Sequence, residues 1–141
     1  MSGGDFIDSN VFVYTFDLLD DEKRNQAQKT VRAALNSGTG VISYQVVQET
    51  LNVLTRKIKT PVSDDLVLNL VERVMQPMWR VMPSVGLFKS ALHNQSRYAL
   101  SFYDALIVAA AQEAGCKRLY SEDMQHGQAF GKLKIVNPFV V

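Results

Sequence analysis

Short runs rich in Val, Ile and Leu alternate with longer segments of helical pattern, and this alternation constrains the fold most strongly. Such short aliphatic runs are typical of strands that are buried in a parallel sheet. Strands are predicted at residues 5–7, 40–43, 79–83, 117–121 and 132–136. Helices are predicted between them, at residues 21–36, 44–58, 63–77, 84–98 and 101–115. This order predicts an α/β fold with a parallel sheet that helices cover on both faces.

The composition is that of an ordinary globular domain. The 141 residues are 47% hydrophobic and 21% charged, and we find no repeat, low-complexity segment or linker. We therefore expect a single domain over residues 1–141. The net charge of +1 neither requires nor excludes a nucleic-acid partner. Cys116 is the only cysteine, which excludes an internal disulfide and a thiolate zinc cluster.

No membrane-spanning segment is expected. The longest apolar run, residues 105–111, is far too short to cross a bilayer. The first ten residues, "MSGGDFIDSN", carry acids where a secretory signal needs a basic and then an apolar stretch. We expect a cytoplasmic protein with no membrane partner.

Two acids follow predicted strands. Asp8 comes directly after the first strand, and Asp123 comes shortly after "KRLYS". In open parallel sheets, ligands bind at the carboxyl ends of the strands, so both positions are candidate site residues. The alternative for each is a turn or helix-cap residue, and "DSN" at residues 8–10 suits that reading too. The next segment, "VFVYTF", could continue as strand or form a short helix.

Two further acids lie on predicted helices. Asp104 is the only polar residue between Phe102 and Ala111, and no Lys or Arg lies one helical turn beyond it. It either reaches back to cap Ser101 or faces a site at the strand ends. Glu49 lies opposite the main apolar stripe of its helix but between two valines, which leaves both an exposed and a functional role open.

Several carboxylates in one cleft would repel each other unless a cation neutralised them. Oxygen ligands without His or Cys suit Mg²⁺ or Mn²⁺ rather than zinc. Acids that hold such an ion serve phosphodiester hydrolysis. The sequence has no Gly-rich phosphate loop and no nucleophile-elbow serine, which argues against nucleoside triphosphate and acyl-transfer chemistry.

Five blocks then carry a family resemblance: "FIDSNVFVY", "ISYQVVQETLNVL", "SFYDALIVAAAQEAGC", "LYSEDM" and "IVNPF". In this order, from residue 6 to residue 139, they resemble the PIN-domain ribonucleases. The nearest group is the toxin component of bacterial and archaeal VapBC toxin–antitoxin modules. The resemblance implies a three-layer α/β/α sandwich with a five-stranded parallel sheet in the order 3-2-1-4-5.

The resemblance also implies a site and a reaction. The four acids of the family fall on Asp8, Glu49, Asp104 and Asp123, which would bind one or two Mg²⁺ or Mn²⁺ ions. Supporting hydrogen bonds would come from three residues: Ser9, Asn10 and Ser121. An activated water would hydrolyse RNA and leave a 5′-phosphate and a 3′-hydroxyl. Family members usually form homodimers and pair with an antitoxin whose tail blocks the acid pocket.

Three alternatives stand beside this reading. A catalytically inert PIN-like module would bind RNA or protein without cutting, although all four acids are present. A haloacid dehalogenase-like phosphatase needs a second aspartate two residues after the first, and here that position is Asn10. A scaffold without enzymatic activity is the third. Glu122 and His126, in the segment after the fourth strand, have no assigned role, and a loop role is the ordinary one for His126.

Overall fold

The computed structural model describes residues 3–59 and 61–140. A six-stranded sheet has the order β3-β2-β1-β4-β6-β5. The strands are β1 (Gly4–Ile7), β2 (Gly40–Ser43), β3 (Trp79–Val81), β4 (Cys116–Tyr120), β5 (Ala129–Phe130) and β6 (Leu133–Val136). The pairs β3–β2, β2–β1, β1–β4 and β4–β6 are parallel, and β5 is antiparallel to β6.

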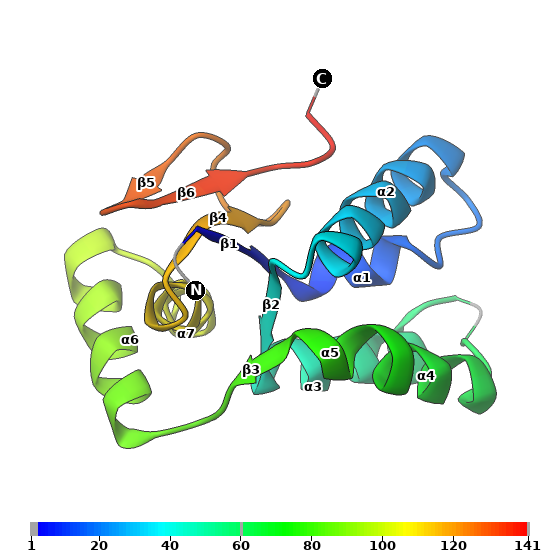
Figure 1. Ribbon diagram of the computed structural model, residues 1–141, viewed down its shortest axis with the longest axis horizontal. Coiled ribbons are helices and arrows are strands. Elements are labelled where there is room, and N and C mark those ends of the chain that lie inside the picture. The colour runs from blue at the N-terminus through cyan, green and yellow to red at the C-terminus, as the bar shows by residue number, and fades with distance from the viewer. Residues whose placement is uncertain (1–2, 60, 141) are drawn as a thin grey trace.

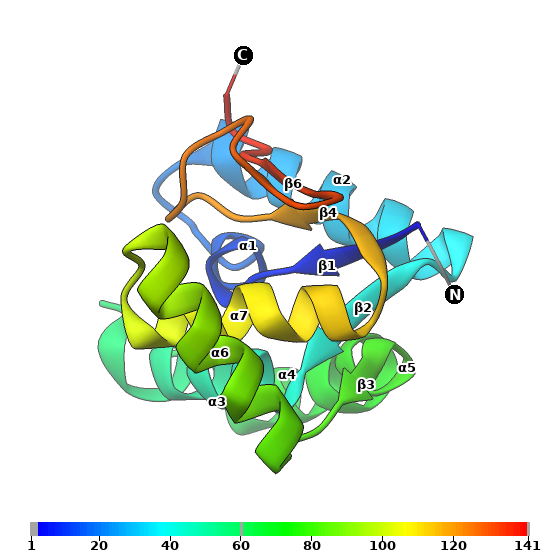
Figure 2. The same ribbon diagram turned by 90° about the vertical axis from the view of Figure 1, so that its left-hand side faces the viewer.

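Helices cover both faces of this sheet. They are α1 (Ser9–Tyr14), α2 (Asp21–Ser37), α3 (Tyr44–Asn52), α4 (Asp64–Leu70), α5 (Gln76–Met78), α6 (Val85–Tyr98) and α7 (Phe102–Glu113). Two π-helical segments, η1 (Val53–Lys57) and η2 (Val71–Met75), continue α3 and α4. Helices α6 and α7 lie on one side of the sheet and α2 lies on the other, as Figures 1 and 2 both show. The predicted three-layer α/β/α sandwich is confirmed.

The sheet has one strand more than the predicted five. The five parallel strands have the predicted order, and the additional strand is the two-residue β5 at the edge. It forms a hairpin with β6 in which Phe130 pairs with Leu133. Gly131 makes the tight turn with a φ of 63°, a conformation that glycine adopts without strain. Two residues are too few to show a periodicity, so the pattern of the sequence could not indicate this strand.

The segment "VFVYTF", left open between strand and helix, begins inside α1. Asp8 caps this helix by accepting a hydrogen bond from the backbone N–H of Ser9. Val11 and Phe12 are fully buried, so the short helix is held by packing as well as by its cap. The cap turns the chain sharply at the carboxyl end of β1, which places Asp8 at the edge of the sheet.

Several helices begin or end at the signals that the sequence provides. Ser63, Ser84 and Ser101 each accept a backbone hydrogen bond at the start of a helix. Helix α2 ends at Gly38, which has a left-handed φ of 73°. The seven residues from Ala105 to Ala111 of α7 are all buried, which makes this helix the centre of one covering layer. No helix in the described part of the chain is long and apolar enough to span a membrane.

Candidate active site

The candidate site lies at the carboxyl ends of β1 and β4, where the strand order reverses. Strand β1 pairs with β4 on one side and with β2 on the other, so the connections leave in opposite directions from this point. The backbone N–H of Asp8 donates to the carbonyl of Tyr120 over 2.9 Å, which joins the ends of β1 and β4. Side chains just after these two strands therefore meet at one edge of the sheet.

Asp8 is the most buried acid of the set, with 3% of its surface exposed. Its carboxylate accepts hydrogen bonds of 2.8 Å from the Ser9 N–H and from the Ser121 hydroxyl. Burial raises the pKa of Asp8 to about 7, against the lowering effect of these two bonds, and the charges of Glu49 and Asp123 raise it further. Asp8 is thus both a helix cap and a buried acid whose charged form its surroundings disfavour.

Glu49 faces the same edge from α3 and is half-buried. One of its carboxylate oxygens accepts from the Ser9 hydroxyl over 3.2 Å, and the other accepts from the Gln45 amide over 3.2 Å. The same Gln45 amide also donates to the backbone carbonyl of Tyr103. Of the two roles left open for Glu49, the exposed one does not fit these contacts, because the side chain turns toward Ser9 and Asp8.

Asp104 lies in the first turn of α7 and is half-buried. Its backbone N–H donates to the Ser101 hydroxyl over 3.2 Å, which is one half of a capping box. Among the hydrogen bonds of the described residues, none joins its carboxylate to the Ser101 N–H. Burial raises the pKa of Asp104, and the nearby charge of Asp123 raises it further. A hydrogen bond with the Ser101 side chain acts in the opposite direction and lowers this pKa. The carboxylate therefore lies near the Ser101 hydroxyl and within electrostatic reach of Asp123.

Asp123 lies on the loop after β4 and is exposed. Its backbone N–H donates to the hydroxyl of the fully buried Ser121 over 3.1 Å. Asn10 adds two contacts to this loop: its amide donates to the Ser121 hydroxyl over 3.4 Å, and its carbonyl accepts from the Glu122 N–H over 3.2 Å. The three predicted supporting residues, Ser9, Asn10 and Ser121, all contact an acid of the site or the loop that carries it.

Three contacts of the site were not predicted from the sequence. Gln45 binds Glu49, and the Tyr14 hydroxyl donates to Glu122 over 2.6 Å. The Lys23 ammonium pairs with the other oxygen of Glu122 over 2.5 Å. Only the spacing of Gln45, one helical turn before Glu49, gave a signal in the sequence. The other two contacts join residues that lie about a hundred positions apart.

Other residues weighed in the sequence have structural contacts. Asp5, an acid within β1, accepts hydrogen bonds of 2.7 and 3.1 Å from the Arg118 guanidinium. His126 accepts from the Asn137 backbone N–H, which is an ordinary loop contact. Burial raises the pKa of Cys116 to about 11, so this thiol is a core group and not a nucleophile.

The donors around Asp8 suit a hard divalent cation. All four acids offer carboxylate oxygens, and Asp8 lies within electrostatic reach of both Glu49 and Asp123. In the described residues, no three acidic, histidine or cysteine side chains come close enough to enclose an ion by themselves. Mg²⁺ binds through one or two carboxylates and keeps several waters, so the residues fit such an ion without a closed cage.

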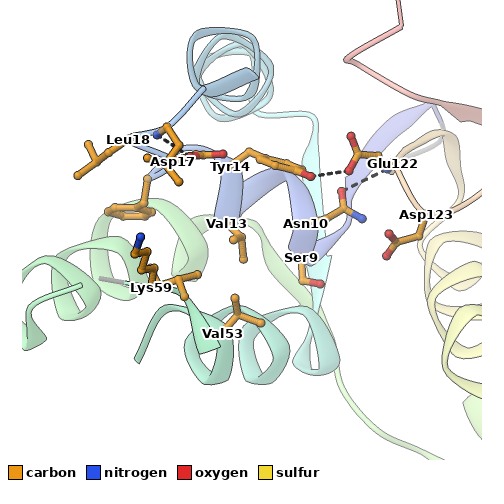
Figure 3. Close-up of a pocket in the computed structure, with 13 residues that line it drawn as sticks. Ser9, Asn10, Val13, Tyr14, Asp17, Leu18, Val53, Lys59, Glu122 and Asp123 are labelled. Atoms are coloured by element: carbon orange, nitrogen blue, oxygen red, sulfur yellow. Dashed lines mark hydrogen bonds between the residues drawn. The ribbon is translucent and has the colours of Figure 1, made fainter. Parts of the chain in front are cut away.

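An apolar groove of about 560 Å³ opens beside the acids. Ser9, Asn10 and Asp123 line one end, and Val13, Phe16, Leu18, Val53 and Ile58 are among the apolar residues that line the rest. Figure 3 shows Val13 and Val53 facing each other across the groove, with Asp123 near Ser9 and Asn10. Leu18 and Leu19, on the loop between α1 and α2, are 75% and 87% exposed at its rim.

Residues 6–129 match the PIN domain family, and the chain belongs to that family. The solved structures that share its fold include the following three. The toxin VapC20 of Mycobacterium tuberculosis, which cleaves the sarcin–ricin loop, is 17% identical with a TM-score of 0.64, over 84% of this chain and 88% of that one. A toxin–antitoxin complex from Klebsiella pneumoniae is 16% identical with a TM-score of 0.67, over 98% of this chain and 100% of that one.

The third structure is FitAcB from Neisseria gonorrhoeae, which is 11% identical with a TM-score of 0.65, over 97% of this chain and 99% of that one. At these identities the likeness concerns the fold. No curated protein matches the chain. The family membership confirms the resemblance on which the sequence-based fold prediction rested.

Proposed function

We propose that this PIN domain is a divalent-metal-dependent endoribonuclease and the toxin of a toxin–antitoxin pair. One observation carries the proposal: a buried carboxylate, Asp8, lies at the switch point of the sheet with two further acids close enough to raise its pKa. A protein that only needed to cap α1 would have no use for this accumulation of negative charge. The named activity of the VapC20 structure and the family membership support the same reaction.

In this proposal each of the four acids binds or orients the metal ion. Asp8, Asp104 and Asp123 would hold Mg²⁺ or Mn²⁺ partly through the waters of the ion, because no three of these side chains enclose one by themselves, and Glu49 would orient the ion or its water. The cation would supply positive charge for the phosphodiester oxygens and lower the pKa of water. Ser9 and Gln45 fix the two oxygens of Glu49, and Ser121 fixes Asp8. Water adds to phosphorus and the RNA 3′-oxygen leaves, which gives a 5′-phosphate and a 3′-hydroxyl.

Cleavage of an RNA panel tests this function. Purified protein is incubated with tRNA and with ribosomal RNA fragments in Mg²⁺, in Mn²⁺ and in EDTA. We expect cutting with either metal and none in EDTA, with loss of at least 100-fold in rate for Asp104→Asn. Asp65→Asn, which changes an exposed acid in the first turn of α4, is the matched control. Cutting by folded Asp104→Asn in EDTA would exclude the proposed mechanism, and RNA binding without cutting would favour the inert-module alternative.

The groove beside the acids supports an antitoxin partner. Its apolar lining and the two exposed leucines at its rim suit apolar side chains of a peptide, and the acids at its end suit an Arg or Lys. A segment with both features would cover the acids and the groove at once. Co-expression with the protein encoded beside its gene, followed by purification, tests for the complex. A Leu18→Glu, Leu19→Glu double variant is expected to lose the complex and keep RNA cleavage.

A second face supports a homodimer. Tyr44, Met82, Phe88 and Tyr103 line one hollow of about 170 Å³, although each is at least 36% exposed. A contiguous exposed patch of aromatic residues and Met is typical of a protein interface. Its lining carries no charge, so two copies could meet there without repulsion.

A further inference from the structure

Three side chains from different parts of the chain meet on the outer side of the acid loop. Glu122, directly before Asp123, accepts a 2.6 Å hydrogen bond from the Tyr14 hydroxyl through one carboxylate oxygen. Its other oxygen pairs with the Lys23 ammonium over 2.5 Å, and Lys23 also donates to the Tyr14 hydroxyl over 3.3 Å. Tyr14 comes from α1 and Lys23 from α2, so this Glu122 cluster joins both helices to the loop after β4.

The aromatic surroundings of Lys23 give the cluster a defined geometry. The Lys23 ammonium lies 4.4 Å from the centre of the Tyr14 ring and 5.3 Å from that of Phe139. These two rings pack edge to face with their centres 5.0 Å apart. An isolated ion pair on a protein surface contributes little. Here the ammonium is held by two rings and a carboxylate together, which limits the positions that Glu122 can take.

The loop that carries Asp123 is therefore held from two sides. On the inner side, Ser121 bonds to Asp8, and Asn10 accepts from the Glu122 N–H. On the outer side, Tyr14 and Lys23 hold the Glu122 carboxylate. The Asp123 carboxylate is itself exposed, so its place at the rim depends on the backbone that precedes it. Figure 3 shows Glu122 turned toward Tyr14, while Asp123 lies on the side of Asn10 and Ser9.

We propose that Tyr14 and Lys23 are positioning residues that act through Glu122 to hold Asp123 at the rim of the acid pocket. The proposal deepens the proposed nuclease function and rests on it for the role of Asp123. The cluster has a second consequence for the site. Glu122 is a fifth carboxylate next to Asp123, and its pairing with Lys23 turns it away from the ion that the other four would bind.

Hydrogen exchange in the metal-free protein tests the positioning directly. Tyr14→Phe removes one hydroxyl and keeps the ring, and Lys23→Met removes the charge and keeps the stem. We expect the amides of residues 121–124 to exchange about 3- to 10-fold faster in both variants, the factor that corresponds to one hydrogen bond. Tyr98→Phe and Lys29→Met are the matched controls, and neither is expected to change exchange in this segment.

Binding of Mn²⁺, measured by the electron paramagnetic resonance of the free ion, tests the link to the site. We expect about 10-fold weaker binding by Tyr14→Phe and Lys23→Met, as for other residues that orient a ligand through a neighbour. Glu122→Gln keeps an oxygen for Tyr14 and loses the ion pair, so it should fall between the wild type and Lys23→Met.

Each outcome decides one of the two proposals. Unchanged exchange at residues 121–124, or an acceleration spread equally over the whole protein, would overturn the positioning role. Faster local exchange with unchanged Mn²⁺ binding would also overturn it, because the loop would then not govern the site. A wild-type protein that binds no Mn²⁺ would refute the proposed nuclease, and the positioning of Asp123 at that site would fall with it. The exchange result would still report whether the cluster holds the loop.

Discussion

The hydroxyl of Ser121 donates a 2.8 Å hydrogen bond to the carboxylate of Asp8, and neither side chain has appreciable exposure to solvent. The same hydroxyl accepts from the backbone N–H of Asp123 over 3.1 Å. One oxygen atom thus joins the acid after β1 to the loop that carries the acid after β4. Because the bond is made to a buried carboxylate, it lowers the pKa of Asp8 and favours the charged form that a metal ligand needs.

Replacing this hydroxyl is expected to destabilise the fold and to weaken the binding of a metal ion by Asp8 and Asp123. Ser121→Ala leaves one oxygen of Asp8 without a donor and the Asp123 N–H without an acceptor. We expect the free energy of unfolding to fall by about 1–3 kcal/mol and Mn²⁺ to bind roughly 10-fold more weakly. Urea unfolding and Mn²⁺ titration measure the two effects. The control is Ser96→Ala on the exposed face of α6, and a Ser121→Ala protein indistinguishable from it would contradict the assigned role.

The buried Asp8 predicts an unusual dependence of stability on pH. Its pKa is about 7 in the folded protein and near 3.8 when unfolded, so the folded state binds the proton more tightly. The contribution of Asp8 to stability is then greatest below pH 3.8 and is lost as the pH rises toward 7. Between pH 5.5 and 7.5 we expect a loss of roughly 2 kcal/mol in EDTA, measured by urea unfolding.

Asp8→Asn separates this effect from the other acids. The variant cannot ionise, so its stability should vary less over the same pH range, and at pH 7.5 it should exceed that of the wild type in EDTA. It should also lose RNA cleavage, as expected where a group needed for function destabilises the fold. A wild-type protein that is equally stable in EDTA at pH 5.5 and 7.5 would show that Asp8 ionises normally.

Most of the fold could be predicted because local signals and tertiary packing agree. The local signals each act over a few residues: serines that cap helices, Gly38 after α2, and short aliphatic strands. The structure contains all three. The order of the parallel strands came from the family resemblance. Strand β5 has only two residues, and the π-helical segments that extend α3 and α4 differ from α-helix by a shift in hydrogen bonding. Neither leaves a periodic pattern in the sequence.

The candidate site could be predicted only in part from the sequence. Asp8 could be singled out by its place after a strand, and Asp104 by its isolation in an apolar helix. Glu49 remained ambiguous because its helix is apolar on two sides, and its contact with Ser9 comes from packing α1 against α3. The Glu122 cluster joins residues that are 99 and 108 positions apart, and nothing local in the sequence indicates such pairs.

Two glycines are expected to respond oppositely to alanine. At Gly40, where β2 passes under α2, a Cβ would collide with the Met78 sulfur and lie 3.0 Å from the Ala34 Cβ. Gly40→Ala should therefore destabilise the protein by about 1–3 kcal/mol. Gly86, near the start of α6, has its nearest such neighbour at 3.9 Å, so Gly86→Ala should stabilise it by about 0.5–1 kcal/mol. Thermal unfolding of both variants checks the direction of each change in stability. A change in the same direction for both would contradict this packing.

The proposed homodimer face predicts a change of mass in solution. Phe88 is 42% exposed beside the hollow that Tyr44 and Tyr103 also line. Phe88→Glu places a charge there, and in a two-fold interface that charge would be buried in both copies. We expect a dimer for the wild type and a monomer for Phe88→Glu by light scattering. Leu68→Glu, at an exposed position on α4, is the control, and a wild-type monomer at high concentration would refute the dimer.

The cation and the pH dependence of Asp8 are linked, which gives the most direct test of the metal site. An ion that binds only the folded protein stabilises it by about 1.4 kcal/mol at ten times its dissociation constant. For a chain of this size, the melting temperature should rise by roughly 3–5 °C. Because the ion favours charged Asp8, the increase on adding Mn²⁺ should be larger at pH 7.5 than at pH 5.5. Asp104→Asn should reduce the increase, and Asp65→Asn should not. An equal increase at both pH values, retained in Asp8→Asn, would mean that Mn²⁺ binds elsewhere on the protein.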